Sequence, residues 1–567
     1  MPPYNNTIEK YYNPYNFSPI SARVYKPSWR KMISQDIPFS DGISGSIDVT
    51  FEALTPLIIK EGKDKPESVN LNGKPFIPGT SVKGMVRNVL EILSLSKIGP
   101  LVNDNRYSMR DFDNNDYTLK TKANTDQIKP GLLVKINDLY HLIESPKCEK
   151  LSYQEIADFK QDVDVSGLRS AKTVKGKYEQ IPGRPFYILN DDNEKYVLLL
   201  SGWMNSKKHE YGIQIPRIID PKPLDHSVID DFLFIHEHEV KSESWTFWKA
   251  KTKITNFNRN PTYDELTDKL CFAPVFYTKD EEGTISSLGL AFLHRELYAN
   301  SIHDLLDESH KTDELDMAQC IFGSSNHDLK GRVQFAPAFV NMNGKSINQQ
   351  AKDIILGSPK PTFYPFYLKQ EGRYPSTFSD NYAKINGWKR YLVHQKIVEQ
   401  IITERQKKVK TEIKPLPKGV SFTTKIRFHN LKPQELGALL SALTFHGNSD
   451  KCFHLMGMAK PLGYGKLKLI KIEPIVPDKF DAAGYMALFE KKLCEECPCS
   501  FEEWKTDVAP ALAIATGNYN NEIHYPGQGK ERPFDDFKAI KVNNLSIVDF
   551  APKLNNFELK SLNNLKP

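Results

Sequence analysis

The stretch FIPGTSVKGMVRNVLEILSLSK, residues 76–97, carries the clearest structural signal in the chain. Pro78-Gly79 is a turn signal, and Thr80 or Ser81 can cap the start of a helix. The apolar residues that follow recur at helical spacing; they are Val82, Val86, Val89, Leu90 and Leu93. Upstream, residues 45–60 alternate between apolar and polar side chains, which predicts a half-buried strand. Strand, polar loop and capped amphipathic helix therefore make the first half of a fold.

A matching arrangement recurs later in the chain. Residues 421–431 alternate like a strand, and Pro433 stands at the first turn of a leucine-rich helical pattern. A glycine-rich loop then leads into a strand at 467–473, and GRVQFAPAFV at 331–340 predicts one more strand. The order βαβ…βαβ is that of a ferredoxin-like fold, so we expect an α+β protein.

Composition excludes several classes of protein. The chain has 567 residues, with 76 Lys plus Arg against 70 Asp plus Glu, so 76 − 70 gives +6. No run approaches the roughly 20 apolar residues of a membrane helix, and the first residues lack a secretory pattern. Seven cysteines, an odd number, fit a reducing compartment. We therefore expect a soluble cytoplasmic protein with no membrane contact.

The organisation that we expect has five parts. The first residues, rich in Tyr, Asn and Pro, are either a strap over the body or a partly disordered tail. The predicted parts are the strap at 1–44, the first half of the core at 45–97, a large mixed insertion at 98–320 that can hold a second similar lobe, the second half at 321–475, and an extension at 476–567.

Residues 384–418 form a basic segment. They contain ten Lys and Arg and three acids, so 10 − 3 gives +7, and the rest of the chain sums to 6 − 7 = −1. Basic charge beside aromatic rings suits a phosphate backbone with splayed bases. The alternative is a solvated helix face with Lys/Glu pairs. Lys389, Arg390 and His394 are the candidate RNA-binding residues here.

The predicted helix start is a second candidate phosphate site. Lys83 and Arg87 are four residues apart, on one side of the helix, and Thr80 and Ser81 lie at its head. Free N–H groups and the helix dipole favour an anion at this end. The alternative is an ordinary cap with two cations that face water.

The glycine-rich loop at 457–465 is the third candidate. Gly457, Gly463 and Gly465 permit close approach of the backbone to a ligand or a positive φ, and Lys460 and Tyr464 stand between them. The loop lacks GK[ST] and precedes a strand, which argues against a P-loop. It is either pressed against an RNA strand or a tight bend between core elements.

Metal and catalytic motifs are weak. Cys494, Cys497 and Cys499 can open a zinc site, but no second pair follows, which favours reduced cysteines at a helix end. His236 and His238 stand at strand spacing, and we expect exposed histidines rather than metal ligands. No nucleophile elbow, H-E-x-x-H or Walker motif is present.

Taken together, these motifs resemble the RAMP superfamily, the ferredoxin-fold RNA-binding subunits of CRISPR systems. The resemblance covers about 45–475 and is closest to backbone subunits of type III effector complexes. It rests on the helix start at 77–87, on Phe322-Gly323 with Gly331-Arg332-Val333, on residues 419–440, and on the glycine-rich loop. Pro14-Tyr15-Asn16-Phe17 and residues 381–395 also resemble segments of a less characterised branch. The insertion and residues 476–567 lie outside the resemblance.

The resemblance implies an RRM-type core that binds crRNA along the Lys83/Arg87 helix and the glycine-rich loop, in an antiviral ribonucleoprotein with other CRISPR effector subunits and guide-paired target RNA. Some relatives cleave target RNA with an Asp that precedes the IPG motif and with a divalent metal. Asp64 stands near that place, so Mg²⁺ is the one cofactor that the resemblance suggests. Two alternatives remain open: a metal-independent guide-processing endoribonuclease that uses His394, His429 or His454, and a non-catalytic scaffold for protein partners.

Overall fold

The computed structural model divides the chain into two compact units, each with its own core. Unit 1 consists of residues 1–104 and 300–567, and unit 2 of residues 105–299. The structure describes residues 13–62, 65–102, 104–110, 117, 127–159, 163–181, 183, 185–189, 194–202, 207–252, 255–346, 350–357, 360–372, 375–475, 480–517, 523, 525, 534–547 and 557–563. Asp64 and residues 1–12 of the expected strap lie outside the described residues.

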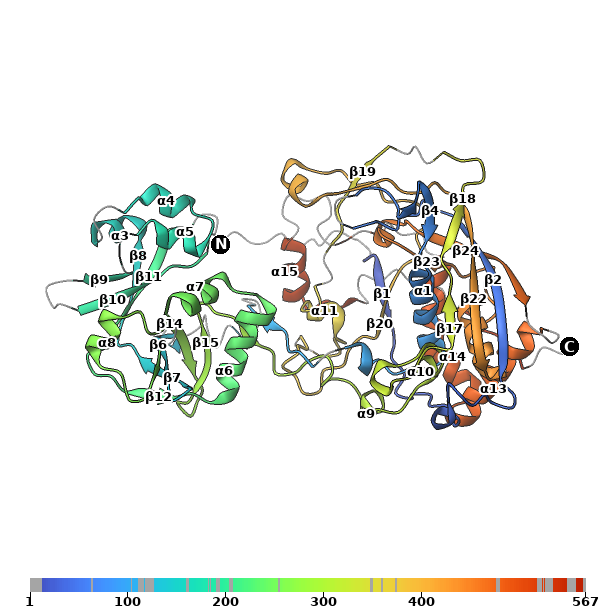
Figure 1. Cartoon of the computed structure of the whole chain (residues 1–567), viewed down its shortest axis with the longest axis horizontal. Coiled ribbons are helices and arrows are strands. Elements are labelled where there is room, and N and C mark those ends of the chain that lie inside the picture. Colours follow the sequence, from blue (N-terminus) through green and yellow to red (C-terminus); the bar gives the residue numbers. More distant parts are fainter. Residues whose placement is uncertain are drawn as a thin grey trace. The chain divides into compact units, whose positions relative to one another are not determined.

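Unit 1 is built on one antiparallel sheet (Figure 1). The strands, in spatial order, are β23 (His454–Leu455), β24 (Lys466–Ile475), β2 (Ile43–Ala53), β22 (Ser421–Leu431), β18 (Ala338–Asn341), β4 (Lys74–Ile77) and β3 (Asn70–Leu71), with β17 (Val333–Phe335) also paired to β22. Along the chain, the core elements follow the succession βαββαβ: β2, α1 (Gly79–Leu93), β17 with β18, β22, α12 (Pro433–Thr444) and β24. Across the sheet, the fourth of these strands (β24) lies beside the first (β2), which is followed by the third (β22) and the second (β18). The order is ferredoxin-like, and the expected α+β class is confirmed.

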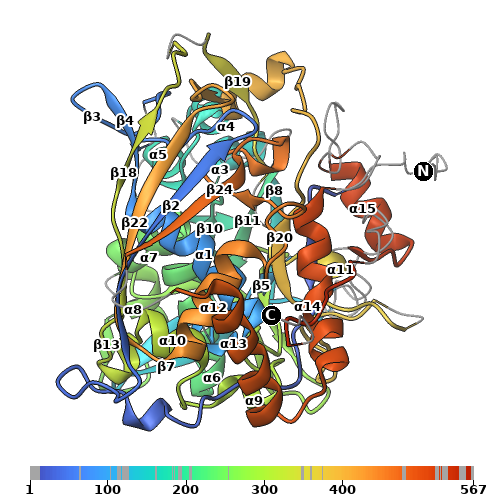
Figure 2. The same cartoon turned by 90° about the vertical axis from the view of Figure 1, so that its right-hand side faces the viewer.

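Alternating side chains explain why the sheet has one buried face. Ile47, Val49 and Phe51 of β2 and Phe422 and Ile426 of β22 are fully buried against helices. The helices are α1 (Gly79–Leu93), α12 (Pro433–Thr444), α13 (Ala482–Glu496) and α14 (Phe501–Thr516). Figure 2 shows α12 and α13 side by side. The period of two thus puts the apolar set of each strand under the helices and leaves the polar set on the other face.

Two local predictions need correction. Helix α1 begins at Gly79 with Pro78 as its N-cap and no side-chain cap, so the prediction that Thr80 or Ser81 caps it was wrong. A Cβ at Gly79 would overlap the Phe335 carbonyl, so the helix start lies tight against β17. The strand expected at 331–340 is split into β17 and β18, because Pro337 has no N–H to donate to the sheet.

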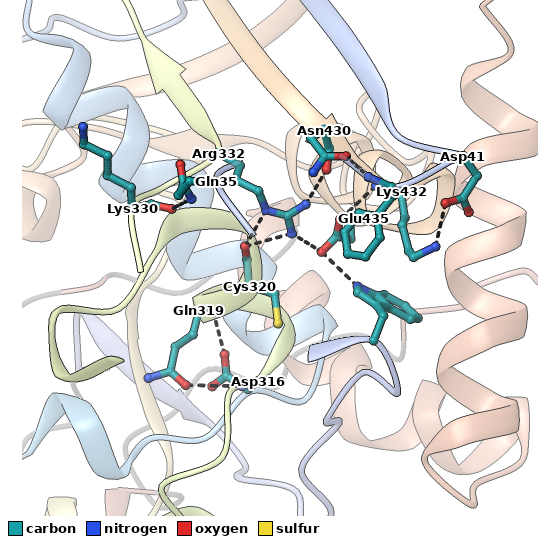
Figure 3. Close-up of polar contacts among 12 residues, drawn as sticks. Gln35, Asp41, Asp316, Gln319, Cys320, Lys330, Arg332, Asn430, Lys432 and Glu435 are labelled. Carbon is teal, nitrogen blue, oxygen red and sulfur yellow. Dashed lines mark hydrogen bonds and ion pairs between the residues drawn. The ribbon is translucent and has the colours of Figure 1, made fainter. Parts of the chain in front are cut away.

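A buried ion pair holds helix α12 against the sheet (Figure 3). The Arg332 guanidinium bonds the Glu435 carboxylate and the backbone carbonyls of Cys320 and Asn430. Arg332 is 4% exposed and Glu435 0%. Glu435 also accepts from the Trp29 indole N–H at 3.1 Å and from the Lys432 backbone N–H at 2.9 Å. We call Arg332, Glu435 and these partners the arginine hub.

The segment that follows residue 12 lies on unit 1. Strand β1 (Tyr15–Ser18) pairs antiparallel with β20 (Trp388–Tyr391), with Tyr15 opposite Tyr391. Aromatic rings gather here: the centre of the Tyr15 ring lies 6.5 Å from that of Phe366 and 6.2 Å from that of Tyr391. The other elements of unit 1 are β19 (Lys352–Ile354), β21 (Thr411–Ile413), α9 (Glu308–Lys311), α10 (Met317–Phe322), α11 (Tyr364–Tyr367), α15 (Phe534–Val542), η1 (Arg30–Met32), η2 (Gly99–Leu101), η5 (Ser325–His327), η6 (Glu404–Val409) and η7 (Lys460–Leu462).

Unit 2 contains two main sheets with their own core. The four-stranded sheet has the order β8 (Cys148–Ser152), β11 (His209–Gln214), β10 (Glu194–Leu199), β9 (Phe186–Leu189). The six-stranded sheet has the order β12 (Pro221–Pro223), β7 (Leu139–Glu144), β6 (Lys129–Ile136), β14 (Ala273–Lys279), β15 (Ile285–Gly289), with β13 (Asn256–Phe257) parallel to β6. A short pair joins β5 (Ser108–Met109) to β16 (Glu296–Leu297).

The helices of unit 2 are short. They are α3 (Tyr153–Phe159), α4 (Val165–Ser170), α5 (Val174–Glu179), α6 (His226–Leu233), α7 (Glu243–Thr252), α8 (Tyr263–Asp268) and the π-helical η4 (Phe234–Glu239). The prediction that His236 and His238 lie on a strand was wrong, because η4 continues helix α6 directly. In the part of the chain that the structure describes, no helix has the length and apolar character to cross a membrane.

Candidate nucleic-acid interface

A cleft of about 410 Å³ opens in unit 1 where three elements meet. It is lined by Ser81, Gly84, Met85 and Asn88 of α1, by Lys389, Arg390 and Tyr391 of β20, and by His454, Leu455, Met456, Gly457 and Lys460 of β23 and the glycine-rich loop. The helix start, the basic segment and the loop, which the sequence singled out separately, thus border one cleft.

Helical spacing explains why α1 presents one face to the cleft. Ser81, Met85 and Asn88 are separated by four and three residues and fall on one side of the helix. Val82 and Val86 fall on another side and are fully buried in the core. Ser81 lies in the first turn, so the amide end of this 15-residue helix is at the cleft. The dipole of the helix favours an anion at this end, whereas the Ser81 and Val82 N–H groups already donate to the Pro78 carbonyl.

Strand β20 contributes two cations to the cleft wall. The Lys389 ammonium donates a hydrogen bond to the Tyr367 hydroxyl at 2.6 Å and lies 3.8 Å from the centre of the Tyr15 ring. The Arg390 guanidinium donates through Nη1 to the Asn88 side-chain oxygen at 2.9 Å, whereas its buried Nε has no hydrogen-bond partner among the described residues. Both side chains therefore retain unused donors.

The glycine-rich loop contributes the third cation. The Lys460 ammonium donates to the Gly457 carbonyl at 2.7 Å and lies 5.7 Å from the centre of the Tyr391 ring. A Cβ at Gly457, where φ is +81°, would overlap the Ile58 carbonyl. Glycine at 457 therefore lets the loop lie against the chain behind it and keep Lys460 at the cleft.

Among the described residues, these three cations have no acidic partner. Within the described ranges, Lys389, Arg390 and Lys460 form no ion pair with a carboxylate. Burial lowers the pKa of Lys389 to about 8 and that of Arg390 to about 10, and it also lowers the pKa of Lys460. Partly desolvated charges without a counter-charge are costly, and a bound anion would offset that cost.

His454 is a cleft residue that the sequence identified only as a candidate for catalysis. Its Nε2–H donates to the Leu443 carbonyl at 3.0 Å, which leaves the buried Nδ1 without a partner among the described residues. The ring packs against Phe51 and Phe445. Burial lowers its pKa to about 4, so the ring is neutral at pH 7. Its surroundings are those of a packed core residue that reaches the cleft wall.

Lys83 and Arg87 do not line this cleft. They lie on a different side of α1, where both cations approach the Phe322 ring, at 5.7 and 5.8 Å from its centre. Arg87 also forms an ion pair with Glu91 at 2.7 Å. Thr80 is exposed and is likewise absent from the cleft lining.

Four other predicted residues do not line the cleft. Gly463 and Gly465 both have positive φ, and a Cβ at either position would press on backbone carbonyls, of Lys396 and Met456 respectively. Tyr464 and His394 are buried, and the His394 Nε2 has no partner in the described part of the chain. Burial lowers the pKa of His394 to about 4. Tight bending of the backbone therefore accounts for these two glycines.

Three other lysines of the basic segment form ion pairs. Lys407 contacts Glu404 at 2.6 Å, Lys410 contacts Asp353 at 2.6 Å, and Lys414 contacts Glu67 at 2.9 Å. These pairs are largely exposed and contribute little to stability. The two cations of the segment that line the cleft, Lys389 and Arg390 of β20, form no ion pair within the described residues.

A metal site has no support among the described residues. Searched within those residues, no group of three or more His, Cys, Asp or Glu side chains is arranged to hold a metal ion. Cys494, Cys497 and Cys499 are free thiols at and just after the end of α13, and burial raises the pKa of each. Asp64, the residue that the resemblance links to Mg²⁺, lies outside the described residues.

Comparison with known proteins gives a family match. Residues 50–158 match the model of the RAMP superfamily, which confirms the resemblance drawn from the motifs. The matched region runs from β2 through α1 and into the first strands of unit 2. No curated protein matches the chain. Among solved structures, the crystal structure of Thermofilum pendens Csc2 is similar at 13% identity over 42% of this chain and 60% of that chain, with a TM-score of 0.13.

Proposed function

We propose that this protein is a cytoplasmic crRNA-binding subunit of a CRISPR effector complex, of the type III class that its motifs resemble. The observation that carries the proposal is the cleft in which the amide end of α1, strand β20 and the glycine-rich loop bring three unpaired cations together. The RAMP superfamily match makes RNA the natural source of the anion. Guide-paired target RNA and other effector subunits are its proposed partners.

The chemistry of the cleft suits an RNA backbone. A phosphate can accept hydrogen bonds from Lys389, Arg390 and Lys460 at the positive end of the α1 dipole. Tyr391 lines the same cleft and offers a ring for an unstacked base. Contacts of this kind hold the strand, while base pairing by the guide supplies sequence specificity. Capture of an RNA backbone is therefore the function that the described residues support best.

The test uses the full-length protein and a labelled crRNA, and follows binding by fluorescence anisotropy across a series of KCl concentrations. Lys389→Met/Lys460→Met removes two cations from the cleft and keeps most of the length of both side chains. Lys74→Met/Lys468→Met is the matched control, because both of those lysines are exposed and neither lines the cleft. We expect the cleft variant to bind roughly tenfold or more weakly, and its slope of log K against log salt to be flatter by about 1.4.

Three outcomes would contradict the proposal. Equal losses in both variants would mean that the cleft is not the binding site. Absence of RNA binding at low salt, together with absence of short RNA in the purified protein, would favour the protein scaffold. Specific cutting of repeat RNA in EDTA would favour the guide-processing enzyme, with His454 as the first residue to substitute.

A further inference from the structure

Unit 2 has a cleft of its own, of about 310 Å³. Its lining comes from the four-stranded sheet and from the segment after β15, and includes Lys150, Leu199, Lys207, Lys208, Tyr211 and Phe292. Sites for small organic ligands begin at about this volume. All the residues belong to one compact unit, so the inference does not rest on the proposed function of unit 1.

The pairing of β11 explains which residues meet in this cleft. Tyr211 stands opposite Lys150 on β8 and opposite Leu199 on β10, so the three side chains lie in one row across the sheet. The neighbouring Glu210 points to the other face, where it is fully buried and pairs with Lys177 at 2.6 Å. Leu199 of the Tyr211 row is itself buried in the core of unit 2, so Tyr211 and Lys150 are the members of this row that a ligand in the cleft can reach.

Two aromatic rings of fixed orientation line the cleft. Tyr211 and Phe292 are stacked, with centroids 5.7 Å apart and planes 13° apart. The buried Phe276 meets both rings edge-on, at 5.3 and 5.4 Å. Because Phe276 holds the two planes in place, the rings offer a flat apolar surface, on which a nucleobase can stack with little loss of side-chain entropy.

The cations of the cleft are available to a ligand. Lys150 and Lys208 are exposed, and in the stretches that the structure describes neither forms an ion pair. Lys207 pairs with Glu210 at 2.6 Å, so this one carboxylate is shared by Lys207 and Lys177. Positive charge therefore stands in excess beside the stacked rings, a combination that matches a phosphate attached to a flat base.

We propose that unit 2 binds a nucleotide in this cleft, with the base against the Tyr211/Phe292 stack and the phosphate at Lys150 and Lys208. A free nucleotide and one nucleotide of an RNA strand share this chemistry. An acidic peptide would use the lysines but would leave the flat aromatic surface without a partner. A neutral apolar ligand would leave the lysines without one.

The experiment is photo-crosslinking of the full-length protein with two probes, 4-thiouridine 5′-monophosphate and a pentaribonucleotide that contains one 4-thiouridine. Crosslinked peptides are identified by mass spectrometry, which separates this cleft from that of unit 1. Lys150→Glu/Lys208→Glu is compared with Lys172→Glu/Lys269→Glu, which makes the same charge change at exposed lysines elsewhere in unit 2.

We expect crosslinks to peptides that contain Tyr211 or Phe292, reduced roughly tenfold in the cleft variant and unchanged in the control. A crosslink with the monophosphate identifies a free-nucleotide site, and a crosslink with the pentanucleotide alone identifies a strand site. No crosslink to these peptides with either probe, or an equal reduction in both variants, would overturn the inference. Neither result bears on the lysines of unit 1, so the two proposals fail separately.

Discussion

The arginine hub and the cleft of unit 1 both hold cations away from water, but they differ in what surrounds those cations. In the hub, the Arg332 guanidinium bonds one carboxylate and two backbone carbonyls. In the cleft, Lys389 has a phenol and aromatic rings, and Lys460 has one carbonyl. A buried cation with a full set of partners belongs to the fold, whereas one that lacks a counter-charge is poised for a ligand.

The largest effect is expected from Arg332→Met. The substitution leaves the Glu435 carboxylate buried without its counter-ion, and breaking a buried pair in this way costs roughly 3–5 kcal/mol. Urea unfolding monitored by tryptophan fluorescence measures the loss, and the Trp29 indole bonded to Glu435 lies at the hub itself.

The matched control is the double variant Arg332→Met/Glu435→Leu, which removes both charges and should recover much of the stability. RNA affinity per folded molecule should be unchanged in both variants. If Arg332→Met instead kept its stability and lost RNA binding, the hub would be a ligand site and the contrast with the cleft would be wrong.

An intermediate effect concerns acid and the cleft wall. Burial lowers the pKa of His454 to about 4, whereas an unfolded histidine titrates near 6.5. Between these values the unfolded chain binds a proton that the folded chain does not, so the free energy of unfolding falls as pH drops, by up to about 3 kcal/mol. His454→Gln removes this dependence. The free energy of unfolding of wild type and His454→Gln is measured at pH 7 and at pH 4.5, and the difference between the two proteins isolates the contribution of His454 from that of other histidines. If both proteins lost the same free energy between these pH values, His454 would titrate normally.

The smallest effect is a pH profile of RNA binding. Burial lowers the pKa of Lys389 to about 8, so this side chain loses its charge as pH rises from 7 to 9. Loss of one phosphate contact should weaken RNA binding several-fold over that range. Because the pKa in the folded chain lies below that in the unfolded chain, deprotonation stabilises the fold, so the loss would not reflect unfolding. Lys389→Arg should bind with a flat profile; an equal decline in wild type and variant would assign the effect to another group.

The core of the fold could be predicted because its signals are local. Alternation marks β2 and β22, helical spacing marks α1 and α12, and Pro433 stands where α12 begins. The pairing of Tyr15 with Tyr391 could not be predicted, since it joins distant residues and no short pattern encodes it. The start of α1 was misjudged for a similar reason, because contact with Phe335 decides where the helix begins.

The candidate site was predictable in its elements but not in all of its residues. Spacing puts Lys83 and Arg87 on one side of α1, but it does not tell which neighbour that side meets, and Phe322 meets it. The cleft face had a usable signal, since Ser81 and Asn88 repeat at helical spacing on the side away from the valines. For Lys389 and Lys460, the decisive property is the lack of an acidic neighbour, which is a property of three-dimensional packing.

The wide separation of the cleft-forming stretches has a consequence for the order of events during synthesis. Helix α1 leaves the ribosome early, but the third cation, Lys460, emerges only after most of the chain has been made. Strand β24, one of the two neighbours of β2 in the sheet, is made later still. Under the proposed function, loading of the guide therefore follows completion of the cleft, after most of the chain has been made.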